Sequence, residues 1–387
     1  RLTSWAGEVV IRLDCDRQRQ AVRSARVRYF PSAARVAVPG CSTRQSSAMI
    51  RSDAATRPSA SRPPDWQTVL ARSVTEAAQL CRLLGLSGQL AEAAGEAARR
   101  FKLVVPRPFL ARITPGDPAD PLLRQILPTA EELLPAAGFS EDPLGEAAAS
   151  PLPGLLTKYQ GRSLIVATRL CGVHCRFCFR RHQTEQPGEG ESRHLEDAIA
   201  RAAADPRLAE VILSGGDPLM LDDPRLARIA GQIAAIPQVR RLRVHTRLPV
   251  LIPQRVTPSL VAALRSTRLT VVLVLHVNHA AEIDEPAAAA IARLADAGIP
   301  LLSQSVLLRG VNDNVDALVQ LFERLVDNRV MPYYLHQLDR VAGAAHFEVP
   351  EAVGAQLIQA ARTRLPGYAV PRYVRDMPGS PNKRPLI

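Results

Sequence analysis

The stretch that decides the fold runs from residue 163 to residue 181 and reads SLIVATRLCGVHCRFCFRR. Its first seven residues are mostly apolar, which predicts a short buried strand over 163–169. Three cysteines, Cys171, Cys175 and Cys178, follow at once with the spacing C-x3-C-x2-C. Three thiols within eight residues indicate a metal site on a strand-end loop rather than a dispersed disulfide framework.

Two kinds of metal site fit this cysteine loop. Three thiolates on one loop can hold three corners of a [4Fe-4S] cluster and leave the fourth iron open for a second ligand. The alternative is a structural zinc ion, with His174 or His182 as the fourth ligand of a Cys3His set. Zinc motifs usually pair two C-x2-C knuckles, and the sequence has no second one. The spacing therefore favours the iron–sulfur cluster.

Five further apolar runs follow the cysteine loop at regular intervals, and we expect them to form strands over 210–215, 242–246, 270–276, 300–307 and 330–336. Helical patterns lie between the strands, near 194–204, 224–235, 258–265, 285–297 and 314–328. Strands that alternate with helices predict right-handed βαβ units and a parallel sheet. A full eight-fold barrel would need more chain. The predicted α/β fold is therefore an open six-stranded parallel β/α partial barrel, with its chemistry at the carboxyl ends of the strands.

The part of the chain before this barrel differs in composition. Residues 1–62 contain twelve Arg and four acidic residues, which is +8 of the net charge of +12. We expect this basic leader to be disordered, so the charge is weak evidence for nucleic-acid binding by the folded body. Helical spacing begins after the linker-like RPSASRPP at 57–64. Residues 63–150 are therefore predicted to form a small, mainly helical region, followed by the barrel over 151–387.

Several function classes are excluded or restricted by composition. No apolar run approaches the roughly 20 residues that a membrane-spanning helix needs, and the first twenty residues carry charges where a signal peptide would be apolar. Together with the clustered thiols, this predicts a cytoplasmic protein without a membrane partner. Only three lysines are present, Lys102, Lys158 and Lys383, so chemistry that requires a primary amine has few candidates.

A second motif, LSGGDPL at 213–219, ends the next expected strand. Gly215 and Gly216 would let the backbone approach a ligand closely, and Asp217 offers an acceptor for an ammonium group. An ordinary strand-end turn would use the same residues. Following the cysteine loop, however, the motif resembles the site for the methionyl amino group in the radical S-adenosylmethionine (SAM) superfamily. The resemblance implies that SAM chelates the open iron and is cleaved reductively to a 5'-deoxyadenosyl radical.

The order of motifs between about Tyr159 and Lys383 resembles the lysine 2,3-aminomutase family of radical SAM enzymes. The matching stretches are YQGRSLIVATRLCGVHCRFCFRR, LSGGDPL, HVNHAAEID, SQSVLLRGVND, MPYYLHQLDRVAGAAHF and the loop around Lys383. That family also uses pyridoxal 5'-phosphate (PLP), bound to a lysine in a C-terminal loop. The resemblance implies an isomerase that moves the amino group of L-lysine from C2 to C3.

The resemblance also implies which residues hold the cofactors. The PLP lysine of the family falls on Lys383, and the tyrosine and arginine that contact PLP fall on Tyr159 and Arg162. A glutamine beside the cofactor falls on Gln304. A histidine that contacts SAM falls on His276, which taken alone can equally be a satisfied core histidine.

Three charged residues fall on positions that bind the substrate in the family. Arg180, just past the cysteines, matches the arginine that grips the substrate carboxylate, for which a planar guanidinium offers a bidentate fork. Asp339 and Asp376 match two carboxylates that hold the substrate ε-ammonium. Taken alone, each aspartate can equally be a surface or helix-capping acid. As a pair, they predict a substrate with a cation far from its reacting carbon.

Two departures from the free-lysine members of the family concern the biological role. No cysteine follows Cys178, whereas those enzymes carry zinc-binding cysteines in a C-terminal extension, and Arg384 stands where a threonine usually follows the PLP lysine. The compact end and the stretch LHQLDRVAGAAHF at 335–347 resemble instead the branch that makes (R)-β-lysine for translation elongation factor P. The implied partners are L-lysine, an electron donor such as flavodoxin or ferredoxin, and an elongation factor P ligase downstream.

Three alternatives remain open from the sequence. The first is a free amino-acid aminomutase of metabolism. The second is a PLP-free radical SAM enzyme that modifies a peptide or RNA, with the basic leader as a docking arm. The third is an iron–sulfur electron carrier, which would need neither an open iron nor the lysine loop.

Overall fold

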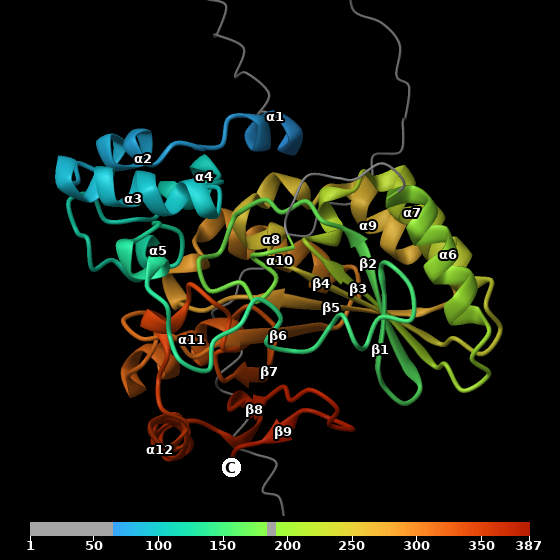
Figure 1. Ribbon diagram of the computed structural model, residues 1–387. Coiled ribbons are helices and arrows are strands. Elements are labelled where there is room, and N and C mark those ends of the chain that lie inside the picture. The colour runs from blue at the N-terminus through green and yellow to red at the C-terminus, as the bar shows by residue number, and fades with distance from the viewer. Residues whose placement is uncertain (1–64, 184–190) are drawn as a thin grey trace, which may run out of the picture. The chain divides into compact units, whose positions relative to one another are not determined.

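The computed structural model describes residues 65–183 and 191–387 (Figure 1). All of them belong to the unit Arg62–Ile387. The predicted disordered leader, residues 1–62, lies outside the described residues. The boundaries predicted for the helical region and the barrel stay predictions.

The described residues form a nine-stranded sheet whose strands lie side by side in the order of the chain. The strands are β1 Leu155–Tyr159, β2 Arg162–Thr168, β3 Glu210–Gly215, β4 Arg241–Thr246, β5 Thr270–His276, β6 Leu301–Val306, β7 Met331–His336, β8 Arg372–Arg375 and β9 Arg384–Pro385. Strands β2 to β8 are parallel, whereas β1 and β9 run antiparallel at the two edges. The predicted parallel α/β fold is confirmed, and the six expected strands are β2 to β7.

The sequence pattern does not predict the seventh parallel strand, β8. This strand has four residues, RYVR, of which Tyr373 and Val374 are buried. It pairs with β7 through Tyr334, Leu335 and His336. Because parallel strands end at the same edge of a sheet, β8 delivers the following residue, Asp376, to the edge where the cysteine loop also begins.

Helices flank the parallel strands: α6 contacts β2, α11 contacts β7 and α12 contacts β8 (Figure 1). Their bounds are α6 Glu191–Ala203, α7 Asp223–Ala234, α8 Leu248–Leu251, α9 Pro258–Arg265, α10 Glu285–Asp296, α11 Val315–Asp327 and α12 Glu351–Arg362. The five expected helices are confirmed as α6, α7, α9, α10 and α11. Side-chain oxygens of Asp222, Thr257, Asp284 and Asn314 accept backbone N–H groups and cap the starts of α7, α9, α10 and α11.

Short helices precede β1, as the helical spacing predicts. They are α1 Trp66–Ala71, α2 Ala77–Leu83, α3 Gly88–Arg100, α4 Arg107–Leu110 and α5 Pro121–Arg124, followed by the 3-10 turn Ala130–Leu133. Leu80 and Phe109 from these helices are fully buried in the same hydrophobic cluster as Ile165 of β2 and Leu273 of β5. The helical region therefore shares one core with the sheet.

Side chains alternate along the strands between the core and an inner cavity, with the period of two that a strand imposes. In β4, Leu242 and Val244 are buried in the core, whereas Arg243 and His245 line the cavity. The sheet therefore carries a polar inner face. Within the described residues, no helix combines the length and the apolar character needed to cross a bilayer.

Candidate active site

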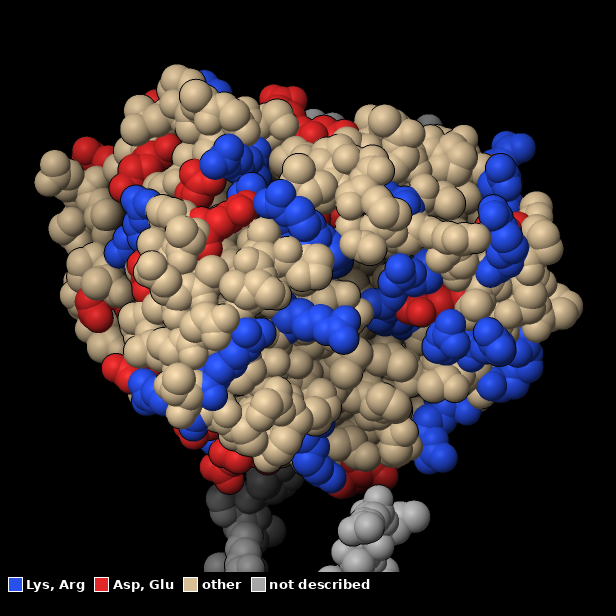
Figure 2. Space-filling view, turned by 90° about the horizontal axis from the view of Figure 1, so that it is seen from below, with Lys and Arg blue, Asp and Glu red and all other residues tan. Residues whose placement is uncertain are grey.

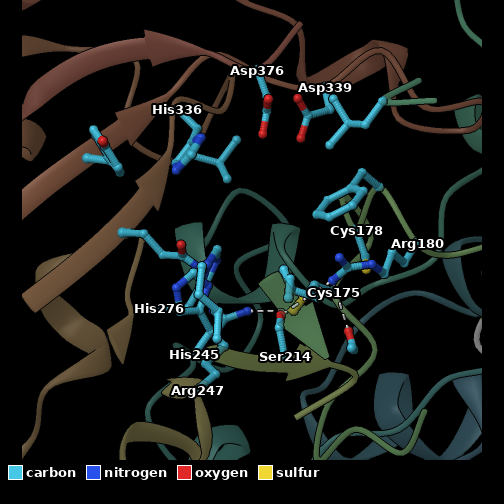
Figure 3. A pocket seen from close by; sticks show the side chains of 18 of the residues that line it. Cys175, Cys178, Arg180, Ser214, His245, Arg247, His276, His336, Asp339 and Asp376 are labelled. Carbon is cyan, nitrogen blue, oxygen red and sulfur yellow. Dashed lines mark hydrogen bonds between the residues drawn. The ribbon is translucent and has the colours of Figure 1, made fainter. Parts of the chain in front are cut away.

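A cavity of about 580 Å³ opens where the parallel strands end, which is in the size range of small-molecule sites. Its lining contains every predicted site residue: Cys171, Cys175, Cys178, Arg180, Gly215, Gly216, Asp217, His276, Gln304, Asp339, Asp376, Lys383, Tyr159 and Arg162. Figure 3 shows Cys175, Cys178 and Arg180 at one end and Asp339 and Asp376 at the other. Residues far apart in the sequence are thus brought together, while their individual roles stay predictions.

The three cysteines of the loop are free thiols that line one end of the cavity. Burial raises the pKa of Cys178 to about 11 and the pKa of Cys171 well above its ordinary value. Binding to iron removes the proton from such a thiol outright. Three half-buried cysteine thiols on one loop suit a soft metal centre such as an iron–sulfur cluster, so the residues present fit the predicted group.

The two histidines that could complete a zinc site, His174 and His182, each contact the backbone through one ring nitrogen. His174 Nδ1 lies 2.8 Å from the backbone oxygen of Lys102, and His182 Nε2 lies 3.1 Å from the backbone oxygen of Ala342. One ring nitrogen of each histidine is thus engaged, although a metal-bound histidine commonly makes the same contact through its non-ligating nitrogen. No three His, Cys, Asp or Glu side chains among the described residues converge on a single-ion site. A cubane takes each thiolate on a different iron, so it does not require such convergence.

The two glycines of the second motif are required by the cysteine loop itself. A Cβ on Gly215, whose φ is +112°, would lie 2.5 Å from the backbone oxygen of Thr168. A Cβ on Gly216 would lie 2.2 Å from the backbone oxygen of Leu170. The Gly216 N–H also donates to Thr168 O at 2.7 Å. The missing side chains, which were expected to let a ligand come close, also let the two glycines pack against the backbone of Thr168 and Leu170. This backbone contact fixes the start of the cysteine loop.

Asp217 organises the ends of two strands. Its Oδ1 accepts from Leu219 N at 2.9 Å and Thr246 Oγ1 at 2.7 Å, and its Oδ2 accepts from Arg247 N at 2.7 Å and Leu248 N at 3.1 Å. Burial raises its pKa, although these hydrogen bonds oppose the shift. The carboxylate is already well supplied with donors, so contact with a methionyl amino group stays a prediction.

Arg180, predicted to grip the substrate carboxylate, is paired with a glutamate that no sequence motif marks. Its Nε and Nη2 each donate to a carboxylate oxygen of Glu146 at 2.7 Å, and both side chains are buried. Nη1 lies 3.3 Å from Gly215 O and 3.5 Å from Ser214 Oγ. Lys158 Nζ lies 3.8 Å from Glu146 Oε1. Burial opposes the charge on Arg180, but Glu146 raises its pKa overall.

At the other end of the cavity, Asp376 bridges two residues predicted to contact PLP. Lys383 Nζ donates to Asp376 Oδ2 at 2.5 Å, and Tyr159 Oη donates to Asp376 Oδ1 at 2.6 Å. Burial opposes the charge on Asp376, but the Lys383 ammonium and both hydrogen bonds lower its pKa overall. The cation seat predicted for the substrate therefore holds the lysine of the protein itself.

Asp339 is a carboxylate of the cavity that lacks a charged partner among the residues described. In the part of the chain that the structure describes, no ion pair reaches its carboxylate. Burial raises the pKa of Asp339 to about 7, Lys383 opposes the shift, and Asp376 reinforces it. A half-buried acid with a raised pKa lacks a paired cation, and a bound ammonium would supply one.

Further cations of the cavity suit an anionic group near Lys383. The Arg162 guanidinium lies 5.0 Å from the centre of the Tyr159 ring, and Arg243 and Arg372 also line the cavity. Arginine is a preferred partner of phosphate because its fork matches the phosphate oxygens. A primary amine beside such arginines fits PLP. On the face seen in Figure 2, Lys and Arg side chains gather around a hollow in which acidic side chains are also visible.

Histidines occupy the middle of the cavity in their neutral form. Burial lowers the pKa of His276 and of His336 to about 3 in each case. His276 stacks on Phe177 with ring centres 5.6 Å apart, and its Nε2 lies 3.1 Å from Asn278 Nδ2. His336 lies in β7 and also lines the cavity, although no sequence motif marks it. These residues add hydrogen-bonding groups without adding positive charge.

Comparison with known proteins agrees with this site. Residues 165–322 match the model of the radical SAM superfamily. The chain is 46% identical over 323 residues to the L-lysine 2,3-aminomutase of Escherichia coli (strain K12), covering 83% of this chain and 94% of that protein. Identity to the L-lysine 2,3-aminomutase of Haemophilus influenzae is 41% over 319 residues, covering 82% and 94%. For the L-lysine 2,3-aminomutase of Clostridium subterminale it is 38% over 324 residues, covering 84% and 78%.

The parallel β/α sheet, the cysteine loop at the end of β2 and the match to the superfamily model define a radical SAM enzyme. Such enzymes use a [4Fe-4S] cluster and SAM, and the cysteine site fits both. Within that class, the chain belongs to the lysine 2,3-aminomutase family, whose members are isomerases.

Proposed function

We propose that this protein converts L-lysine to β-lysine, using a [4Fe-4S] cluster, SAM and PLP. One observation carries the proposal: a single cavity has three cysteine thiols at one end and, at the other, a primary amine beside two aspartates. A thiol cluster alone would fit many radical enzymes. The amine and the paired carboxylates add a PLP site and a seat for a distant cation.

The residues divide the task of binding between the two ends of the cavity. When bound, the cluster and SAM supply hydrogen abstraction by a radical, and PLP supplies activation of the α-amino group for migration. Asp339 and Asp376 would hold the ε-ammonium, and Arg180 would hold the α-carboxylate. A substrate held at both charged ends presents a fixed carbon to the reacting group, which is how an enzyme gains from orientation.

Lys383 is proposed as the residue that carries PLP, with Arg162 beside it for the phosphate. To react as a nucleophile, Lys383 must lose a proton and leave its ion pair with Asp376. When Lys383 leaves Asp376, that carboxylate would also become free for the substrate ammonium. The same carboxylate would thus serve the lysine first and the substrate afterwards.

The test is anaerobic incubation of the reconstituted protein with L-lysine, SAM and dithionite, followed by chromatography of the amino acids formed. We expect β-lysine, and we expect none when PLP is omitted. Borohydride reduction should fix PLP to Lys383, and Lys383→Ala should abolish fixation while the iron–sulfur absorbance remains. Lys102→Ala is the matched control. PLP fixed to Lys102, or β-lysine formed without PLP, would refute the proposal.

The proposed biological role is supply of (R)-β-lysine for elongation factor P in the cytoplasm, with a flavodoxin or ferredoxin as electron donor. The 46% identity to the Escherichia coli relative and the stretch 335–347 support this branch over a free amino-acid aminomutase. The free thiols of the cysteine loop suit a reducing compartment. Mass spectrometry of elongation factor P from cells with and without the gene tests the role, and an unchanged modification would refute it.

A further inference from the structure

A buried arginine contacts one of the three cysteines of the loop (Figure 3). Arg247 directly follows β4, is 5% exposed, and its Nη1 donates to Cys175 Sγ at 2.8 Å. Its Nη2 donates to Glu282 Oε2 at 2.8 Å and to Gln125 Oε1 at 2.6 Å. The guanidinium is therefore fixed between a carboxylate on one side and a cysteine sulfur on the other.

Glu282 fixes the position of the Arg247 guanidinium, because the glutamate side chain is itself held by several hydrogen bonds. Its side chain is fully buried, and its Oε1 accepts from Asn278 N at 2.9 Å, His279 N at 3.1 Å and Gln125 Nε2 at 3.1 Å. An arginine that served only to neutralise Glu282 would have no need to place its other terminal nitrogen at Cys175. The direction of Nη1 toward the sulfur thus calls for a separate explanation.

The third guanidinium nitrogen of Arg247 also indicates that a bound group is missing beside the cysteines. Nε is buried and has no acceptor among the described residues. Buried donors are almost always paired in native proteins, so an orphaned one calls for a missing partner. Arg247 lines the cavity beside the cysteines, where a bound anionic group would provide that acceptor.

We propose that Arg247 raises the reduction potential of the [4Fe-4S] cluster held by Cys171, Cys175 and Cys178. The inference rests on the proposed function, which provides the cluster. Reduction adds one electron from dithionite or a low-potential protein donor, while no proton moves and no covalent bond changes at Arg247. A cationic donor to a ligating sulfur stabilises the more negative, reduced state. Glu282 acts in the opposite direction because it compensates part of the Arg247 charge.

The test is a redox titration of the reconstituted, SAM-free protein with dithionite, followed by electron paramagnetic resonance. Arg247→Gln should lower the midpoint potential of the cluster, and Glu282→Gln should raise it. We expect each change to alter the reduction equilibrium constant roughly tenfold, which is about 59 mV for a one-electron couple. Opposite shifts from two neighbouring substitutions would distinguish a charge effect from a general disturbance of packing.

Arg255→Gln provides the matched control. Arg255 is fully buried and pairs with Asp223 at 2.7 Å, and its other donors bond Leu219 O and Leu221 O, so its loss should leave the potential unchanged. If Arg247→Gln fails to fold, Glu282→Gln carries the test, because loss of the compensating carboxylate should still raise the potential. Unchanged potentials in the folded variants, or shifts in one direction, overturn the inference alone. Wild-type protein without a reducible cluster overturns both the inference and the proposed function.

Discussion

The two ends of the cavity treat charge differently. At the cysteine end, Arg180 and Arg247 are each paired with a buried glutamate at 2.7 to 2.8 Å. At the opposite end, Asp376 is paired with the half-buried Lys383, and Asp339 has no ion pair within the described residues. Each of these two arginines has a carboxylate partner, whereas Asp339 at the opposite end has no paired cation in the described part of the chain.

This difference in charge pairing suits the two ends to different roles, one in holding a cofactor and the other in recognising a substrate. Fixed pairs hold the groups around a cofactor in one geometry and need no ligand to stabilise them. A carboxylate with a raised pKa gains most when a cation arrives, so it favours ligands that bring one. The cysteine end therefore suits a resident cluster, and the aspartate end suits a substrate that binds and leaves.

The largest expected effect comes from the cysteine end. Cys178→Ala should abolish cleavage of SAM to deoxyadenosine, because two thiolates do not hold a three-cornered cluster. Deoxyadenosine is measured by chromatography after anaerobic incubation with SAM and dithionite. Cys81→Ala, at a buried free cysteine outside the cavity, is the control and should retain cleavage. Undiminished cleavage in Cys178→Ala would contradict the assignment of the cluster.

Substitutions at the two ends of the cavity should change the free energy of unfolding in opposite directions. Glu146→Ala leaves the buried Arg180 unpaired, which should lower the free energy of unfolding by about 3–5 kcal/mol. Asp339→Asn should instead raise it by roughly 1–3 kcal/mol at pH 8, because burial penalises the ionised carboxylate there. Urea unfolding at pH 8 without lysine measures both.

Two internal checks accompany this pair of variants. Glu348→Ala breaks the more exposed pair with Arg340 and should cost no more than about 1 kcal/mol. The gain from Asp339→Asn should shrink as pH falls below about 7 and disappear below about 4, where both the folded and the unfolded wild type carry a protonated acid. A loss of stability in Asp339→Asn at pH 8 would contradict the picture of an incomplete end.

Most of the fold could be predicted from the sequence because β2 to β7 are apolar runs of six or seven residues separated by helical spacing. Strand β8 could not, since RYVR contains only two buried residues and depends on pairing with β7. The same strand explains how Asp376 reaches the cavity. Sequence resemblance could suggest its role, but it could not show the route by which the chain brings it there.

The predicted site residues all line one cavity, but their partners could not be found from the sequence. Glu146 lies in an Ala-rich stretch and meets Arg180 34 residues later, while Arg247 meets Cys175 across 72 residues. Such pairs have no periodic spacing. The only available signal was position, because Arg247 follows a strand at the edge where the chemistry was expected.

Removal of one aspartate should weaken recognition of lysine without emptying the site. Asp376→Asn should lower kcat/KM for lysine by roughly 10- to 100-fold, since a charge-assisted hydrogen bond contributes about 1.5–3 kcal/mol. The content of iron and PLP should not change. Arg180→Lys should also weaken binding, because a lysine cannot keep both bonds to Glu146 and still offer a nitrogen to the substrate. Turnover of glutamate by the wild type, or unchanged lysine kinetics in Asp376→Asn, would contradict the proposed cation seat.

The smallest expected effect is a pH dependence that belongs to the aspartate end alone. Because the pKa of Asp339 in the ligand-free protein is about 7, the acid becomes neutral as pH falls from 8 to 6. The lysine ammonium stays charged throughout, so its affinity should fall as pH falls, by up to about tenfold per pH unit below 7. The pKa of Asp376 is lowered and that of His336 is about 3, so neither group titrates in this range.

Calorimetric titration with lysine between pH 6 and 8 measures this dependence, and paired buffers of different ionisation enthalpy report the proton released. Norleucine, which has the same chain without the ε-ammonium, is the matched ligand and should bind with little pH dependence. Asp339→Asn should flatten the lysine profile, whereas Asp376→Asn should keep its slope at lower affinity. A lysine profile that stays steep in Asp339→Asn would assign the titration to another group and remove the distinction between the two ends.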